Sequence, residues 1–92
     1  MKDAWIGDAV LTLYARLKIL REDGVTDGPK AARMTSNQFL AGLGEPSEME
    51  ARIGRVYADA GLEAAFTHIE TELVPLFMRQ EAKRAGGARR RV

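Results

Sequence analysis

The chain has 92 residues, 46% of them hydrophobic and 29% charged, which are the proportions of one small globular domain and exclude a wholly disordered protein. It contains no cysteine and a single histidine, so disulfide frameworks, thiolate metal sites and multi-histidine zinc sites are excluded. The net charge of +1 gives no bulk field that would indicate a nucleic-acid partner.

The N-terminal segment has no charged stretch followed by an apolar run, as a secretory signal would. No stretch approaches the ~18 consecutive apolar residues that cross a bilayer. We therefore expect a soluble, cytoplasmic protein that makes no contact with a membrane.

The first predicted helix covers residues 4–20. Its apolar residues recur at steps of three and four, which predicts one buried face. The residues of this predicted face are Ile6, Ala9, Val10, Leu13, Leu17 and Leu20. Gly7 interrupts the helix at a cost of about 1 kcal/mol relative to alanine. Another backbone or a ligand is therefore expected to approach closely at this position.

Three more helices are expected further along the chain. The second covers 29–43, begins at Pro29 and is weakly apolar; the third ends near Ala58; the fourth covers 62–77 and is kinked at Pro75. Ser47 and Glu50 have the spacing of a capping box at the start of the third helix. Because no alternating apolar and polar segments occur, the predicted fold is all-α.

The last stretch, 79–92, is basic and has little apolar content. We expect residues 1–78 to form the helical domain and 79–92 to form a flexible tail. The tail is either simply solvated or an arm that contacts phosphates, with Arg89, Arg90 and Arg91 as the contacting residues.

Two segments carry acidic residues whose spacing alone leaves their role open. Asp8 either complements the dipole of the first helix or, among small neighbours, faces an ion and a phosphate. Glu50 is either half of the capping box or a metal ligand. Arg52 and Arg55 are either phosphate contacts or a solvated face, and His68 is predicted to be a surface residue.

Taken together, three ordered blocks resemble the ribonuclease III endonuclease domain, and most closely a truncated form of its Mini-ribonuclease III branch. The signature block is 4–11 (AWIGDAVL), the middle block is 35–41 (TSNQFLA), and the third block is 50–54 (EARIG) followed by 56–65 (VYADAGLEAA).

The resemblance implies an all-α homodimer that cuts structured double-stranded RNA with Mg²⁺, or with Mn²⁺ in its place. Asp8 matches the family's signature aspartate and Glu50 its essential glutamate, so both would be catalytic residues and metal ligands. Trp5 falls on the aromatic position that inserts into the partner subunit, whereas on spacing alone it is an ordinary core aromatic. Exposure of Trp5 in one chain distinguishes these interpretations.

The chain also departs from the family pattern. Full-length members carry carboxylates at the positions of Ala4 and Ser47, and their connection before Glu50 is longer, so Glu50 is expected here in the first turn of its helix. These departures favour an alternative, a catalytically silent ribonuclease-III-like module that binds RNA or protein. A small helical DNA-binding module is a third, weaker hypothesis, because no recognition helix is identifiable.

Overall fold

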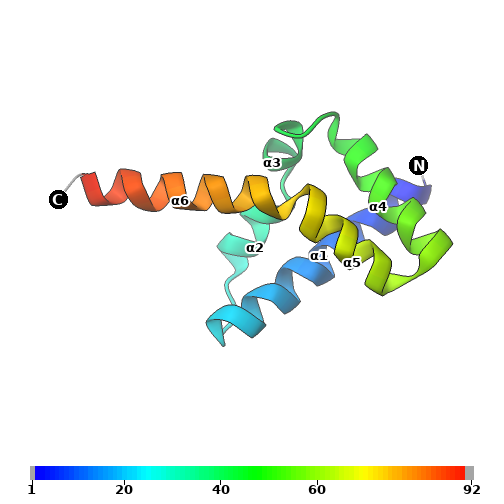
Figure 1. Ribbon diagram of the computed structural model, residues 1–92, viewed down its shortest axis with the longest axis horizontal. Coiled ribbons are helices and arrows are strands. Elements are labelled where there is room, and N and C mark those ends of the chain that lie inside the picture. The colour runs from blue at the N-terminus through cyan, green and yellow to red at the C-terminus, as the bar shows by residue number, and fades with distance from the viewer. Residues whose placement is uncertain (1, 91–92) are drawn as a thin grey trace.

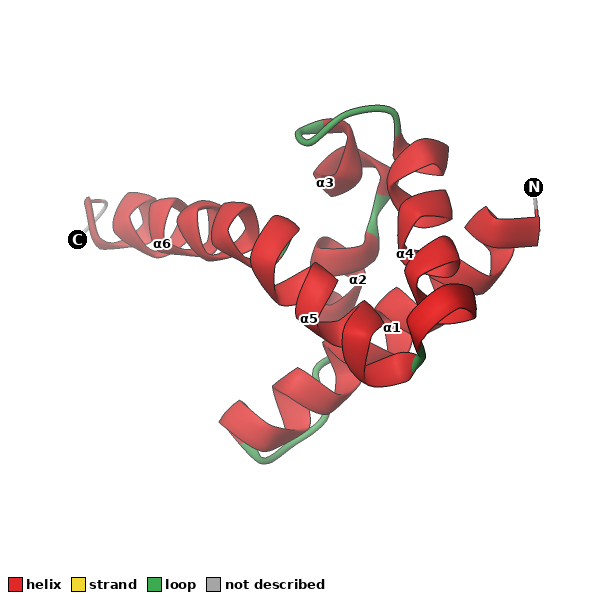
Figure 2. Cartoon of the chain, turned by 45° about the vertical axis from the view of Figure 1, so that its right-hand side comes forward, coloured by secondary structure: helices red, strands yellow, loops and turns green. Residues whose placement is uncertain are grey.

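The computed structural model describes residues 2–90, and within that range the chain forms six helices and no strand. Figure 2 shows the helices in red, joined by short green connections. The all-α prediction is thus confirmed. The helices are α1 (Lys2–Asp23), α2 (Gly28–Thr35), α3 (Asn37–Ala41), α4 (Pro46–Ala60), α5 (Leu62–Glu72) and α6 (Val74–Arg90).

Helix α1 lies at the centre of the arrangement. It packs against α2, α4 and α5, and its contact with α4 is the most extensive between any two helices. Helix α6 projects away from the other helices, toward the end marked C in Figure 1. The long axis of the described molecule therefore reaches 48 Å, against 29 and 20 Å for the other two. No described helix has both the length and the apolar character needed to cross a membrane.

The core gathers apolar side chains from all six helices. Two aromatic pairs contribute to this packing. Tyr14 contacts Phe66 edge to face at 5.2 Å between ring centroids, and Phe39 contacts Phe77 in the same way at 5.9 Å. The largest side chains that are fully buried are Leu11, Met34, Leu40, Ile53, Ile69 and Leu73.

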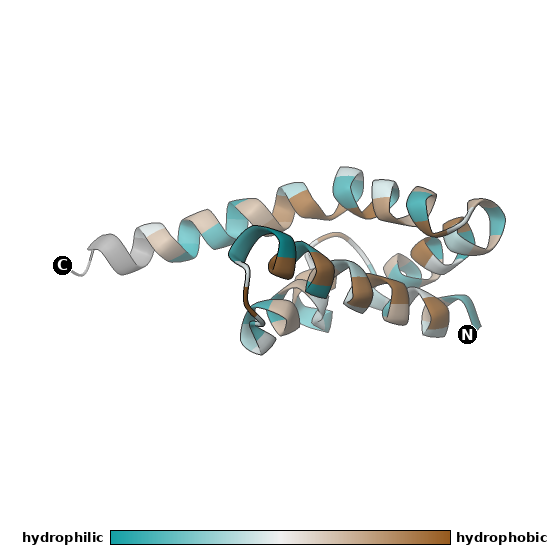
Figure 3. Ribbon diagram, turned by 90° about the horizontal axis from the view of Figure 1, so that it is seen from below, coloured by the Kyte–Doolittle hydropathy of each residue, from teal (hydrophilic) through white to brown (hydrophobic). Residues whose placement is uncertain are grey.

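The predicted buried face of the first helix is wrong except at one residue, Val10. The residues of α1 that are buried are Gly7, Val10, Leu11, Tyr14, Ala15 and Ile19. The other predicted residues are exposed, and they are Ile6, Ala9, Leu13, Leu17 and Leu20. Helix α1 therefore has apolar residues on two faces, and Figure 3 shows hydrophobic residues recurring along most of its length. Only the face that carries Gly7 lets the α4 backbone approach closely, and this approach decides which face of α1 is buried.

The second predicted helix is two helices, because Ser36 breaks it. Ser36 is extended (φ −73°, ψ 154°), and its side-chain oxygen accepts a hydrogen bond from the Phe39 backbone N–H at 3.1 Å. Ser36 thus ends α2 and caps α3, a competition with the helical backbone that is typical of serine. The Thr35 hydroxyl donates to the Ala31 carbonyl one turn back.

The fourth predicted helix is also divided, at Leu73, rather than kinked. Pro75 lacks a backbone N–H and therefore lies in the first turn of a new helix, α6, where no donor is required. Helix α6 then continues to Arg90, so the basic stretch expected as a tail has a helical backbone over 79–90. Arg91 lies outside the described residues, as do the side chains of Arg89 and Arg90.

Candidate functional site

Two glycines bring α1 and α4 into backbone contact. A Cβ atom at Gly7 would overlap the carbonyl oxygen of Glu50, and a Cβ atom at Gly54 would overlap the carbonyl oxygen of Asp3. Both glycines are buried. The close approach expected at Gly7 is therefore made by the backbone of α4, and it sets Asp8, the next residue, beside the turn of α4 that carries Glu50.

Asp8 and Glu50 line one groove between the beginnings of α1 and α4. The groove has a volume of about 480 Å³ and opens to solvent. Asp8 is exposed and Glu50 is half-buried. The residues that line the groove are Ala4, Trp5, Asp8, Glu45, Ser47, Glu48, Glu50 and Ala51. The structure thus brings together the two acidic residues that the sequence analysis singled out.

The electrostatics of the groove act most strongly on Glu50. Burial, hydrogen bonding to Asp8 and the negative charges of Asp8 and Glu45 together raise the pKa of Glu50 to about 7. A hydrogen bond between two carboxyl groups requires a proton on one of them. A divalent cation between the two groups would supply the positive charge in place of that proton.

The predicted capping box is wrong, because the cap of α4 is Glu45. Its carboxylate accepts a hydrogen bond from the Glu48 backbone N–H at 2.8 Å. Pro46 is the first residue of the helix and has no N–H, so the cap must precede it and Ser47 falls inside the helix. Glu50 is consequently in the second turn of α4, and its side chain is free to face Asp8.

Ala4 and Ser47 also line the groove. Among the described residues, no group of three or more acidic, histidine or cysteine side chains converges on a possible metal position. Asp8 and Glu50 nevertheless supply a pair of hard carboxylate oxygen donors. Such a set fits Mg²⁺, which retains several water ligands and is commonly bound through one or two carboxylates.

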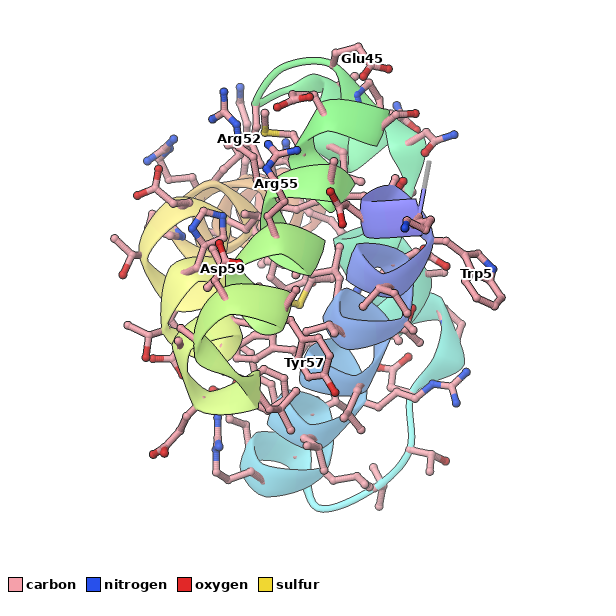
Figure 4. All side chains as sticks on the ribbon, turned by 90° about the vertical axis from the view of Figure 1, so that its right-hand side faces the viewer. Trp5, Glu45, Arg52, Arg55, Tyr57 and Asp59 are labelled. Atoms are coloured by element: carbon pink, nitrogen blue, oxygen red, sulfur yellow. The ribbon has the colours of Figure 1, made fainter. Side chains whose placement is uncertain are left out.

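Arg52 and Arg55 share one acidic partner beside the groove. The Arg55 guanidinium lies 2.9 Å from a Glu48 carboxylate oxygen, and the Arg52 Nε lies 3.6 Å from the same oxygen. The hydrogen bond and the charge of Arg55 lower the pKa of Glu48 below its ordinary value. Both arginines are exposed on α4 (Figure 4), with their charge partly neutralised by Glu48.

Trp5 is 79% exposed, so it is not a core aromatic in the single chain. Figure 4 shows its ring directed away from the rest of the molecule. Next to it, the exposed residues of α1 form a continuous apolar stripe, which we define as Ile6, Ala9, Leu13, Leu17 and Leu20. These residues recur at the period of the helix and therefore make one exposed apolar face.

Sequence reasoning missed the roles of Glu45 and Glu48. The signal that identifies Glu45 is Pro46, because proline at the first helical position places the cap one residue earlier. No comparable signal identifies Glu48 as the partner of both arginines. His68 lies on α5 outside the groove and is partly buried.

Comparisons of the chain with protein-family models, with curated proteins and with solved structures find no match.

Proposed function

We propose that the protein is a metal-dependent endoribonuclease that cleaves structured double-stranded RNA as a homodimer. Asp8 and Glu50 would hold Mg²⁺, with Mn²⁺ able to take its place. The observation that carries the proposal is that two carboxylates, from separate helices, line one solvent-open groove at a crossing where glycines hold the backbones in contact.

The chemistry is hydrolysis of a phosphodiester. A water oxygen bonds to phosphorus and the water loses a proton, the bond to the 3′ oxygen breaks, and that oxygen takes up a proton. Bound Mg²⁺ would supply an activated water and offset the charge on the leaving oxygen. Asp8 and Glu50 would hold and orient the ion as anions, which for Glu50 requires loss of its proton. The Ser47 hydroxyl, in the same groove, is a hydrogen-bond donor for a phosphate oxygen.

Homodimer formation is supported by the apolar stripe of α1. Leu13, Leu17 and Leu20 are 42%, 44% and 46% exposed, which is unusual for three leucines on one helix face. A second copy would cover this face together with Trp5. A chain of this size buries only roughly two-thirds of the surface that its unfolded form exposes, less than larger domains bury, so association would add stability.

The second candidate function is a catalytically silent module that binds RNA or protein. It is favoured by one observation: in the groove, the positions of two family carboxylates are occupied by Ala4 and Ser47. Retention of both Asp8 and Glu50 favours the nuclease, because a silent module has no need for two carboxylates placed together.

The two functions are separated by incubating the purified protein with a long RNA duplex and Mg²⁺. We expect cleavage by the parent and loss of cleavage in the Asp8→Asn and Glu50→Gln variants. Glu63→Gln, which removes an exposed carboxylate on α5, is the matched control and should cleave as the parent does. Equal duplex binding by all four proteins without cleavage would support the silent module instead.

A further inference from the structure

A second groove lies at the junction of α2, α3 and α6, and it differs in charge from the acidic one. Its volume is about 310 Å³. The residues that line it are Arg33, Ser36, Gln38, Phe39, Gln80, Glu81 and Arg84. Two cations and one carboxylate give the lining a net positive charge, and most of the remaining side chains are hydrogen-bond donors.

One of the two arginines that line this groove, Arg33, is already paired with a carboxylate. Arg33 donates two hydrogen bonds to Glu81, from Nε at 3.0 Å and from the terminal nitrogen at 2.9 Å. Both side chains are about two-thirds buried, with 33% and 26% exposed. This forked geometry uses both oxygens of Glu81 and ties α6 to α2.

The other cation, Arg84, forms no ion pair with any described residue. It lies one helical turn beyond Gln80 on α6, on the side that faces the groove. Across the groove, Gln38 is exposed near the start of α3. An arginine fork with two side-chain amides is a donor set that suits phosphate oxygens.

Charge favours a nucleic-acid backbone over other occupants of this groove. Beyond the groove the exposed surface of α6 carries two further cations, Arg79 and Lys83. Arg52 and Arg55, by contrast, share Glu48. Lys2, Arg16 and Arg21 on α1 also form no ion pair with a described residue, but Arg79, Lys83 and Arg84 lie within six positions of α6, so unpaired positive charge is densest there.

We propose that the groove between α2, α3 and α6 binds phosphodiester oxygens of an RNA duplex, with Arg84 as the principal contact and Gln38 and Gln80 as supporting donors. This inference rests on the proposed function, because the duplex is the same substrate that the acidic groove would cut. The inference places contacts to the phosphate backbone of RNA on a surface that is separate from the groove of Asp8 and Glu50. Because the contacts are to phosphates, they would not distinguish between RNA sequences.

The test is the affinity for a long RNA duplex in Ca²⁺, which keeps cleavage out of the measurement, at a series of salt concentrations. Arg84→Gln should weaken binding about tenfold and reduce the slope of log affinity against log salt by about 1. Arg21→Gln is the matched control, because it removes the same charge from an exposed position on α1 outside the groove. Its affinity and slope should equal those of the parent.

Equal weakening by both variants would overturn the inference, because it would indicate an unlocalised charge effect. An Arg84→Gln variant that binds like the parent would also overturn it, while leaving the proposed function intact. Absence of duplex binding by the parent would overturn the proposed function itself. A titration with inorganic phosphate at constant ionic strength, followed by the NMR signals of the Gln38 and Gln80 amides, separates the sources. Saturation by free phosphate that a duplex cannot displace would assign the groove to a small anion.

Discussion

Glu50 on α4 and Asp8 on α1 line the same groove, although 42 positions separate the two residues in the sequence (50 minus 8). Burial, hydrogen bonding to Asp8 and the charge of Asp8 together raise the pKa of Glu50 to about 7. Near neutral pH Glu50 is therefore protonated in part of the molecules. A cation that binds between Asp8 and Glu50 must displace this proton.

This relationship predicts how stability depends on pH. The pKa of Glu50 is higher in the folded chain, about 7, than its ordinary value of 4.5, so the folded state binds more protons between these values. The stability that Glu50 contributes is complete below pH 4.5 and is lost as pH rises through 7. In EDTA, Glu50→Gln should therefore unfold at a higher urea concentration than the parent at about pH 8, and the difference should vanish at about pH 4.

The role of Asp8 in that shift is tested by repeating the urea experiment with Glu50→Gln in the Asp8→Asn background. Without the charge of Asp8, the gain in stability that Glu50→Gln causes at high pH should be smaller. Part of the gain should remain, because Glu50 is still partly buried. An advantage of the same size in both backgrounds would show that the two carboxyl groups do not interact.

Backbone contact between α1 and α4 predicts that Gly7→Ala and Gly54→Ala are strongly destabilising. Each added methyl group would overlap a carbonyl oxygen of the other helix, and the helices would have to separate, at a cost of about 3 kcal/mol. Chemical denaturation measures the loss. Gly86→Ala is the control, because open space surrounds Gly86 in α6, and its stability should be unchanged or raised by up to about 1 kcal/mol.

The same glycine substitution has a second expected result. Because Gly7 precedes Asp8, separation of the helices moves Asp8 away from Glu50. A folded Gly7→Ala variant should therefore have a lower Glu50 pKa than the parent, which is followed by the NMR shift of the Glu50 carboxyl carbon. Retention of the parent titration curve would contradict the role assigned to the glycine crossing.

The ion pair between Arg33 and Glu81 predicts a measurable contribution to stability. It is forked and mostly buried, so Glu81→Gln should cost about 1 kcal/mol at neutral pH. The hydrogen bond to Arg33 lowers the pKa of Glu81, so this contribution is present above the ordinary pKa and is lost as pH falls through the lowered value. Glu22→Gln, which breaks an exposed pair within α1, should cost no more than about 0.5 kcal/mol.

The apolar stripe of α1 predicts self-association. Sedimentation at micromolar concentration should give the mass of a dimer for the parent and of a monomer for Leu13→Lys combined with Leu17→Lys. Both leucines are already more than 40% exposed, so the double variant should keep the helical circular dichroism of the parent. Trp5 provides a second readout, since its fluorescence should shift to the red when the dimer dissociates. A monomeric parent would contradict the prediction.

The fold class was predictable because the sequence contains only helical periodicity, whereas the buried face of α1 was not. Ile6 and Leu13 are as apolar as Val10 and Leu11, so periodicity alone identifies two faces and cannot choose between them. The choice depends on Gly7, whose missing side chain admits the α4 backbone. Packing of another helix, not the pattern within α1, therefore decides which face is buried.

The position of Glu50 was ambiguous for a similar reason. The spacing from Ser47 to Glu50 fits a capping box, but Pro46 moves the cap to Glu45 and releases Glu50. The role of Ser36 was equally local and equally easy to miss, because serine within an apolar pattern is compatible with a helix interior or with a boundary. In both cases one hydrogen bond, from a backbone N–H to a side-chain oxygen, marks where the helix begins.

The measurement that tests the central claim most directly is a titration of the protein with Mn²⁺, followed by the electron paramagnetic resonance signal of the free ion. We predict one site per chain in the parent, and loss of that site in both Asp8→Asn and Glu50→Gln but not in Glu63→Gln. Mn²⁺ binding that is undiminished in the Asp8 and Glu50 variants, or that is absent from the parent, would contradict the assignment of these two carboxylates as the metal ligands.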